Sequence, residues 1–389
     1  MKYMGHKGKL LKVLGDVLLE ESKNSSSIAD PFCGSGAVSW FLAERTSKRV
    51  VSGDLQGFAA CRAGAITHRT ALLDHNKLLR SWLCKAETIV RDIVEKFPNA
   101  EESVEPRPSS TDETIKYVLR SRVFCERVLP PLLETTGLKF PITKAYGGHY
   151  FSPMQAIWLD ALRATLPTRR DSRIVALAAL IETAGKCAAS PGHTAQPFQP
   201  TATSSRHILD AWSRSVEKIL REATTNIASR SAQVLGESKV ADFLQTIEVL
   251  EAGDTVFADP PYSDVHYSRF YHVLETLYHG LEIEVTGRGR YPCISVRPSS
   301  RFSLRAGSKG AALDLIETCS RKRLSLVLTF PSSGASNGLS AQDFIDAGKQ
   351  MYSSIQQHEV DSDFSTLGGN AVTRDARLNC RESIICFRP

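Results

Sequence analysis

The sequence predicts an α/β protein with an open sheet and a largely helical segment in the middle of the chain. Short segments rich in β-branched and aromatic residues predict buried strands, at residues 28–30, 50–54, 254–258, 324–330 and 382–387. Between these strands, residues 58–135 and several stretches from residue 153 to about residue 230 show helical spacing of apolar residues.

The composition is that of a soluble globular protein. The chain has 389 residues, 42% hydrophobic and 23% charged, which predicts two or three domains. No run approaches the roughly 18 apolar residues of a membrane span, and the first residues lack the apolar core of a signal peptide. The nine cysteines include no Cys-x-x-Cys pair, which favours a reduced cytoplasm over structural zinc or a disulfide framework.

The positive charge lies mainly in the middle of the chain. The net charge is +6, and residues 71–235, with 22 basic and 17 acidic residues, carry +5 of it. This excess suits a nucleic-acid partner, although an excess of this size also serves solubility alone.

The segment Phe257-Ala258-Asp259-Pro260-Pro261-Tyr262 predicts a reactive site. The prolines end the strand, since neither can donate to a β-ladder, and ligands bind at the carboxyl ends of strands in open α/β sheets. The Asp259 carboxylate and the Pro260 carbonyl can each accept one N–H of an exocyclic amine, which favours a pyramidal nitrogen with its lone pair free to attack. The Tyr262 ring can stack on a base, which is worth about 1–3 kcal/mol. The alternative interpretation is a Pro-Pro turn with a chance acid and ring.

A base pocket of this kind needs a second wall opposite Tyr262. Three aromatic residues follow closely enough to form it, and the sequence does not choose among them: Tyr267, Phe270 and Tyr271.

A Gly-Ser-Gly turn after the first strand predicts a second ligand-binding feature. Gly34 and Gly36 permit a tight turn and a close approach of the backbone to a ligand. A single Gly-x-Gly is weak support for dinucleotide binding. Asp54 ends the second strand, where an acid can accept from ribose hydroxyls. Its alternative role is to cap the following helix.

Three segments have the composition of nucleic-acid-binding loops. Residues 139–151 interleave basic, aromatic and Gly residues, which suits a loop or hairpin on nucleic acid and equally a structural hairpin. Residues 190–201 carry amide and imidazole side chains that can read base edges. Residues 287–309 hold six basic residues and no acid, as in a phosphate-contacting loop. The candidate contact residues are Lys139, Lys144, Tyr146, His193, Gln196, Arg288, Arg290 and Arg297.

These motifs stand in an order that resembles one enzyme family. Lys2-Tyr3-Met4-Gly5-His6-Lys7 is similar to a Lys-Trp-x-Gly-Gly-Lys motif, with Tyr3 in the Trp position and His6 in the second Gly position. Asp30-Pro31-Phe32-Cys33-Gly34-Ser35-Gly36 and Asp242-Phe243 follow, and the Asp-Pro-Pro-Tyr box comes last. The chain therefore resembles the D12-class (alpha group) DNA adenine N6-methyltransferases over residues 1–60 and about 236–389.

The resemblance implies a doubly wound, mostly parallel methyltransferase sheet with an antiparallel edge strand. It implies a discontinuous catalytic domain, residues 1–70 and 236–389, and a helical target-recognition insert, residues 71–235. The residues expected to bind the donor, S-adenosyl-L-methionine, are Tyr3, Lys7, Asp30, Pro31, Phe32, Gly34, Gly36, Asp54, Asp242, Phe243 and Asp259. Asp242 would accept from the adenine amine of the donor and Phe243 would pack on its ring, while the alternative role of Asp242 is to start a helix.

The implied reaction is methyl transfer to the N6 amine of an adenine flipped out of double-stranded DNA. Asp259, Pro260 and Tyr262 would be the catalytic residues, and no metal is expected. The alternatives are transfer to the N4 amine of cytosine, an inactive nucleic-acid-binding module with a methyltransferase fold, and an RNA substrate. Beyond DNA, the expected partner is a cognate restriction endonuclease or another defence-system component. The protein is expected to be a cytoplasmic monomer with no membrane partner.

Overall fold

The computed structural model describes residues 10–96, 110–365 and 377–389, which form two compact units. Among the described residues, the sheet unit contains those from Leu10 to Ala71, Arg230–Ser268 and Pro298–Pro389, and the helical unit contains those within Leu72–Ser229 and Arg269–Arg297. The helical unit therefore includes a segment, Arg269–Arg297, that lies outside the predicted insert. Two predicted donor-binding residues, Tyr3 and Lys7, lie outside the described residues.

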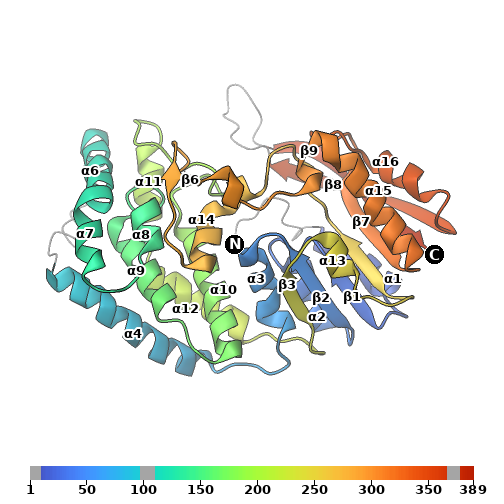
Figure 1. Ribbon diagram of the computed structural model, residues 1–389, viewed down its shortest axis with the longest axis horizontal. Coiled ribbons are helices and arrows are strands. Elements are labelled where there is room, and N and C mark those ends of the chain that lie inside the picture. The colour runs from blue at the N-terminus through green and yellow to red at the C-terminus, as the bar shows by residue number, and fades with distance from the viewer. Residues whose placement is uncertain (1–9, 97–109, 366–376) are drawn as a thin grey trace. The chain divides into compact units, whose positions relative to one another are not determined.

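The sheet unit is built on a seven-stranded sheet of order β3-β2-β1-β4-β7-β9-β8 (Figure 1). Its strands are β1 (Ser27–Asp30), β2 (Arg49–Asp54), β3 (Glu237–Val240), β4 (Thr255–Ala258), β7 (Ser325–Pro331), β8 (Ser354–Ser365) and β9 (Arg377–Arg388). The first five in spatial order pair in parallel, and β9 runs antiparallel to β7. The predicted mostly parallel sheet is thus confirmed.

The antiparallel edge has one strand more than the sequence predicts. The predicted last strand, residues 382–387, lies within β9, and β8 pairs antiparallel with β9 to form the outermost strand. The sequence signal for β8 is weak because its first half, Gln-Gln-His-Glu-Val, is mostly polar and exposed.

Helices cover the sheet in two groups, as expected of a doubly wound fold. They are α1 (Leu11–Glu21), α2 (Ala37–Arg45), α3 (Gly57–Thr67), α13 (Phe243–Ile247), α15 (Arg305–Arg321) and α16 (Ala341–Gly348). In one group α2 packs on α1 and α3, and in the other α15 packs on α13 and α16. Side chains alternate between faces, so Val256 and Ala258 of β4 share the α15 core with Leu326, Leu328 and Phe330 of β7.

The helical unit confirms the helical pattern read from the middle of the chain. Its helices are α4 (His75–Lys96), α6 (Thr111–Val123), the π-helix η1 (Phe124–Val128), α7 (Leu129–Glu134), α8 (Pro141–Tyr146), α9 (Pro153–Ala164), α10 (Arg170–Cys187), α11 (Ser205–Trp212), α12 (Val216–Ala228) and α14 (Ser268–His279). A short hairpin follows, formed by β5 (Val285–Thr286) and β6 (Tyr291–Pro292), and then the 3₁₀-helix η2 (Ile294–Val296). No helix within the described ranges has the length and apolar character needed to cross a bilayer.

Residues 139–151 do not form the predicted hairpin, because helix α8 occupies Pro141–Tyr146 within this segment. The reason is a tertiary contact: buried Asp160 of α9 accepts from the backbone N–H groups of Ile142 and Thr143 at 3.0 and 2.7 Å. These are N–H groups of the first helical turn that have no partner within the helix. The predicted start of α9 is confirmed by a capping box between Ser152 and Gln155.

Candidate functional site

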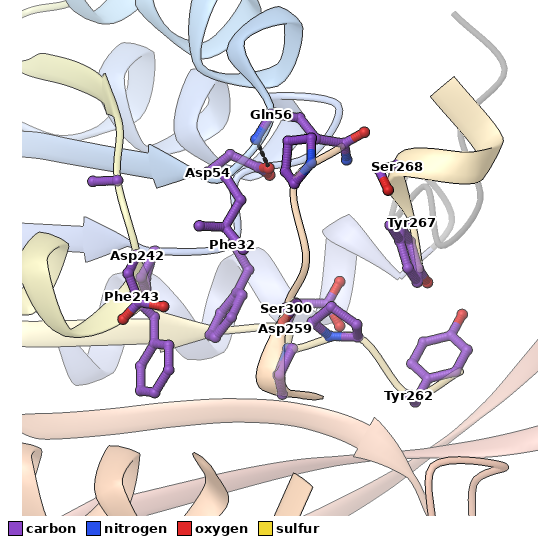
Figure 2. Close-up of a pocket in the computed structure, with 16 residues that line it drawn as sticks. Phe32, Asp54, Gln56, Asp242, Phe243, Asp259, Tyr262, Tyr267, Ser268 and Ser300 are labelled. Atoms are coloured by element: carbon purple, nitrogen blue, oxygen red, sulfur yellow. Dashed lines mark hydrogen bonds between the residues drawn. The ribbon is translucent and has the colours of Figure 1, made fainter. Parts of the chain in front are cut away.

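A pocket opens at the carboxyl ends of β1, β2, β3 and β4, and all of its lining residues belong to the sheet unit (Figure 2). The lining residues are Pro31, Phe32, Asp54, Leu55, Gln56, Ala241, Asp242, Phe243, Asp259, Pro260, Pro261, Tyr262, Tyr267, Ser268, Pro298 and Ser300. Because the strands are parallel, residues that are far apart in the sequence meet at this one edge. The predicted catalytic box and most of the predicted donor-binding residues therefore line one cavity.

The Gly-Ser-Gly turn leaves β1 beside this pocket. Gly34 and Gly36 have φ values of 46° and 78°, in the left-handed region that only glycine adopts without strain. A Cβ at Gly36 would lie 3.2 Å from the backbone nitrogen of Ala63 and 3.2 Å from Nε1 of Trp40. Gly36 is therefore required both by its backbone angle and by the close packing of α2 against α3.

Asp54 ties the turn to the end of β2. Its Oδ2 accepts from the Gly34 N–H at 3.0 Å, and its Oδ1 accepts from the Gln56 N–H at 2.9 Å, the bond drawn in Figure 2. The alternative that Asp54 caps the helix is wrong, because the N-cap of α3 is Gln56 and it has no side-chain cap hydrogen bond. The carboxylate also lines the pocket, so its predicted role toward a ribose stays a prediction.

Asp30 lies behind the turn and does not line the pocket. It is 1% exposed, and its Oδ2 accepts from the Ser39 hydroxyl at 2.6 Å, which in turn accepts from Ser52. Its Oδ1 is buried without a hydrogen-bond partner in the described structure. Burial raises the pKa of Asp30 to about 7 against the opposing effect of the Ser39 hydrogen bond, and repulsion from Asp259 and Asp54 adds to the rise.

An aromatic cluster forms one end of the pocket. The Phe32 and Phe243 rings stack with centroids 5.6 Å apart and 22° between their planes, and the Phe302 ring meets both edge-on. Asp242 is the N-cap of α13, where its side chain accepts from Leu244 and forms a capping box with Gln245. The helix-starting role of Asp242 is thus observed, and its contact with a donor stays a prediction.

The Asp-Pro-Pro-Tyr box follows β4 into the middle of the pocket. Figure 2 shows Asp259 between the Phe32–Phe243 end and the opposite end, where Tyr262 and Tyr267 lie. Of the three candidates for a second wall, Tyr267 lines the pocket. Phe270 and Tyr271 are 4% and 1% exposed in the helical unit, so neither presents a ring to this cavity.

Two residues that the sequence analysis missed hold this box. The Thr329 hydroxyl of β7 donates to Oδ1 of Asp259 at 2.9 Å. The Asn337 amide, in the loop after β7, donates to the carbonyl of Pro261 at 3.0 Å. Neither residue belongs to a motif. The only sequence signal for such a contact was that Thr329 lies in a predicted strand of the same sheet as the strand that precedes Asp259.

The predicted nucleic-acid contacts fall into two groups. Lys139, Gln196 and Arg288 are exposed on the helical unit, where they are accessible to a ligand. The prediction for Tyr146 is wrong, because its side chain is fully buried and its hydroxyl is bonded to Thr276 at 2.9 Å. The sequence signal for the burial of Tyr146 was the spacing of apolar residues around it, because a helix buries its apolar face.

The remaining predicted contacts already have partners within the helical unit. Lys144 pairs with Glu282 at 2.9 Å, and Arg290 pairs with Glu126 at 2.7 Å. The His193 ring accepts from the Ala195 N–H, and burial lowers its pKa. The Arg297 guanidinium lies over the Tyr291 ring, 5.6 Å from its centroid. These contacts weaken the expectation that the four side chains bind phosphates or bases, which stays a prediction.

Comparison with protein families supports the resemblance read from the motifs. A family model described as D12 class N6 adenine-specific DNA methyltransferase matches residues 144–302. The matched segment contains Asp242-Phe243, the Asp-Pro-Pro-Tyr box and Tyr267. The match confirms the predicted resemblance over these residues. A comparison with curated proteins gave no match.

Proposed function

Since its family match implies an adenine-specific DNA methyltransferase, we propose that this protein transfers a methyl group from S-adenosyl-L-methionine to the N6 amine of an adenine flipped out of double-stranded DNA. One observation carries the proposal. Asp259 lies between two chemically different ends of a single pocket, an aromatic end next to the glycine turn and a second end formed by Tyr262 and Tyr267. A donor at the first end and a base at the second would meet at this carboxylate.

The first end suits an adenosine carrying a short amino-acid chain. The left-handed turn at Gly36 allows the backbone to approach the amino-acid part. Asp54 presents a carboxylate at the end of β2 for the ribose hydroxyls.

The aromatic pair limits how the adenine of the donor can lie. A base inserted between two parallel rings needs about 7 Å between their planes, two contacts of about 3.5 Å each. Phe32 and Phe243 are 5.6 Å apart at their centroids, so no base fits between them. Phe243 is 4% exposed, whereas Phe32 is half-buried and faces the pocket. The adenine would therefore lie on the Phe32 side of the pair.

The second end suits a flipped base. Leaving the duplex costs a few kcal/mol, which stacking between Tyr262 and Tyr267 would offset at about 1–3 kcal/mol per ring. The Asp259 carboxylate and the Pro260 carbonyl would accept the two N–H bonds of the amine and stabilise the positive charge that develops on its nitrogen. The bound donor supplies the electrophilic methyl group. Holding the amine in line with that group accounts for much of the expected rate.

The test is Asp259→Ala in a labelled-methyl assay on DNA, with Asp264→Ala as the matched control. Asp264 lies in the same loop but is exposed and outside the pocket. We expect Asp259→Ala to lower the rate at least about 100-fold, as for loss of one preorganised group at a developing charge. Binding of the donor, measured by calorimetry, should persist. Retained activity in Asp259→Ala would refute the assignment, and mass spectrometry of the nucleosides would distinguish N6-methyladenine from N4-methylcytosine.

A further inference from the structure

The Asp-Pro-Pro-Tyr box leaves the sheet without the usual backbone restraints. The prolines at 260 and 261 have no N–H to donate, so the strand ladder cannot continue beyond Ala258. Two side-chain hydrogen bonds to the box come from β7 and from the loop that follows it.

Thr329 is placed to orient the carboxylate. The register pairs Ala258 of β4 with Leu328 of β7, so the next residues, Asp259 and Thr329, lie beside each other. Thr329 is fully buried, and its hydroxyl donates to Oδ1 of Asp259 at 2.9 Å. A donated hydrogen bond to one oxygen restricts rotation of the carboxylate about its Cβ–Cγ bond.

Asn337 is placed to hold the rest of the box. Its amide nitrogen donates to the carbonyls of Pro261 and Phe302, both at 3.0 Å, and its amide oxygen accepts from Leu339 at 3.2 Å. Its backbone N–H also donates to the carbonyl of Tyr262. The side chain is fully buried, and both of its amide protons and its oxygen are used. These bonds tie the second proline and the tyrosine to one fixed point.

We propose that Thr329 and Asn337 are positioning residues for methyl transfer: Thr329 sets the orientation of the Asp259 carboxylate, and Asn337 sets the path of Pro261 and Tyr262. The proposal rests on the proposed function. It extends the acceptor site from the motif to two residues about 70 positions further along the chain.

Thr329→Val and Thr329→Ser form the main test. Valine keeps the shape and β-branching of threonine but removes the hydroxyl, and serine keeps the hydroxyl. We expect Thr329→Val to lower kcat about 10- to 100-fold, from loss of a hydrogen bond to a charged group. Donor affinity and KM for DNA should not change, because both ends of the pocket are intact. Thr329→Ser should recover most of the lost kcat.

Thr255→Val is the matched control. Thr255 is also fully buried, four residues before Asp259 on β4, and its hydroxyl bonds to Ser25 at 2.8 Å, away from the box. Equal falls in kcat for Thr329→Val and Thr255→Val, or full activity of Thr329→Val, would overturn the role of Thr329. Asn337→Ala should lower kcat and also raise KM for DNA, since Tyr262 loses its support. Unchanged kinetics for a folded Asn337→Ala protein would overturn the role of Asn337.

Failure of the proposed function would give a different pattern. If the wild-type protein transfers no methyl group to DNA, the assignment of the enzyme fails, and a spectroscopic readout still tests the positioning role of Thr329. The carboxyl ¹³C resonance of Asp259 should shift in Thr329→Val and return in Thr329→Ser. A resonance that is the same in all three proteins would show that the hydroxyl does not orient this carboxylate.

Discussion

Asp30 should make the protein less stable as pH rises, whereas an ion-paired carboxylate makes a protein more stable as pH rises. The side chain is 1% exposed at the end of β1, with one oxygen bonded to Ser39 and the other without a partner in the described structure. Burial raises its pKa from 3.8 to about 7. Between these values the folded protein binds more protons at this site than the unfolded chain does, so stability falls as pH rises from about 4 to 7. Above about pH 7 the folded protein bears the full cost of a buried charge.

The size of this cost follows from the shift. About 3 pKa units at 1.36 kcal/mol each give an upper limit of about 4 kcal/mol above pH 7. Asp30→Asn removes the charge and keeps the shape. We therefore expect the variant to be more stable than the wild type at about pH 8, by up to about 4 kcal/mol, with the difference disappearing at about pH 4.

Urea denaturation of the two proteins at several pH values measures this difference directly. Asp16→Asn on α1 is a suitable control for the loss of one carboxylate, because Asp16 is exposed. A difference between Asp30→Asn and the wild type that does not vary with pH would show that Asp30 titrates normally in the folded protein. A variant less stable than the wild type at pH 8 would show that the charge is compensated by a group not described above.

Two further predictions concern the two ends of the pocket. Gly36→Ala should lower the free energy of unfolding by about 1–2 kcal/mol, the cost of a left-handed residue with a Cβ, and crowding against Ala63 and Trp40 should add to this loss. The variant should also bind the donor more weakly in calorimetry. Unchanged affinity would show that the turn does not hold the donor. Tyr267→Ala should raise KM for DNA by about 10-fold, from loss of stacking worth about 1–3 kcal/mol, whereas Tyr267→Phe should not. Equal effects of the two Tyr267 variants would point to the hydroxyl instead of the ring.

The sequence allowed four of the five parallel strands and the main site residues to be predicted because local chemistry decides them. It did not predict β3, because Glu237–Val240 is short and mostly polar. The Pro-Pro pair can only end a strand, and the Gly-Ser-Gly turn can only be a sharp turn, whatever surrounds them. The parallel order then brings Asp54, Asp242 and Asp259 to one edge. The same logic failed for residues 139–151, where the pattern of aromatic and basic residues did not reveal that Asp160 would stabilise the start of a helix.

By itself, the sequence determined where β1, β2 and β4 stop and which acids and rings follow them, because these features depend on neighbouring residues. Only the tertiary structure decided that Tyr267, of the three aromatic residues after the box, lines the pocket and that Tyr146 lies in the core. It also decided that Thr329 and Asn337 hold Asp259 and Pro261. The physical reason is distance along the chain. A hydrogen bond between residues 70 or more positions apart depends on the register of two strands and the path of a loop, and no local pattern of residues encodes either.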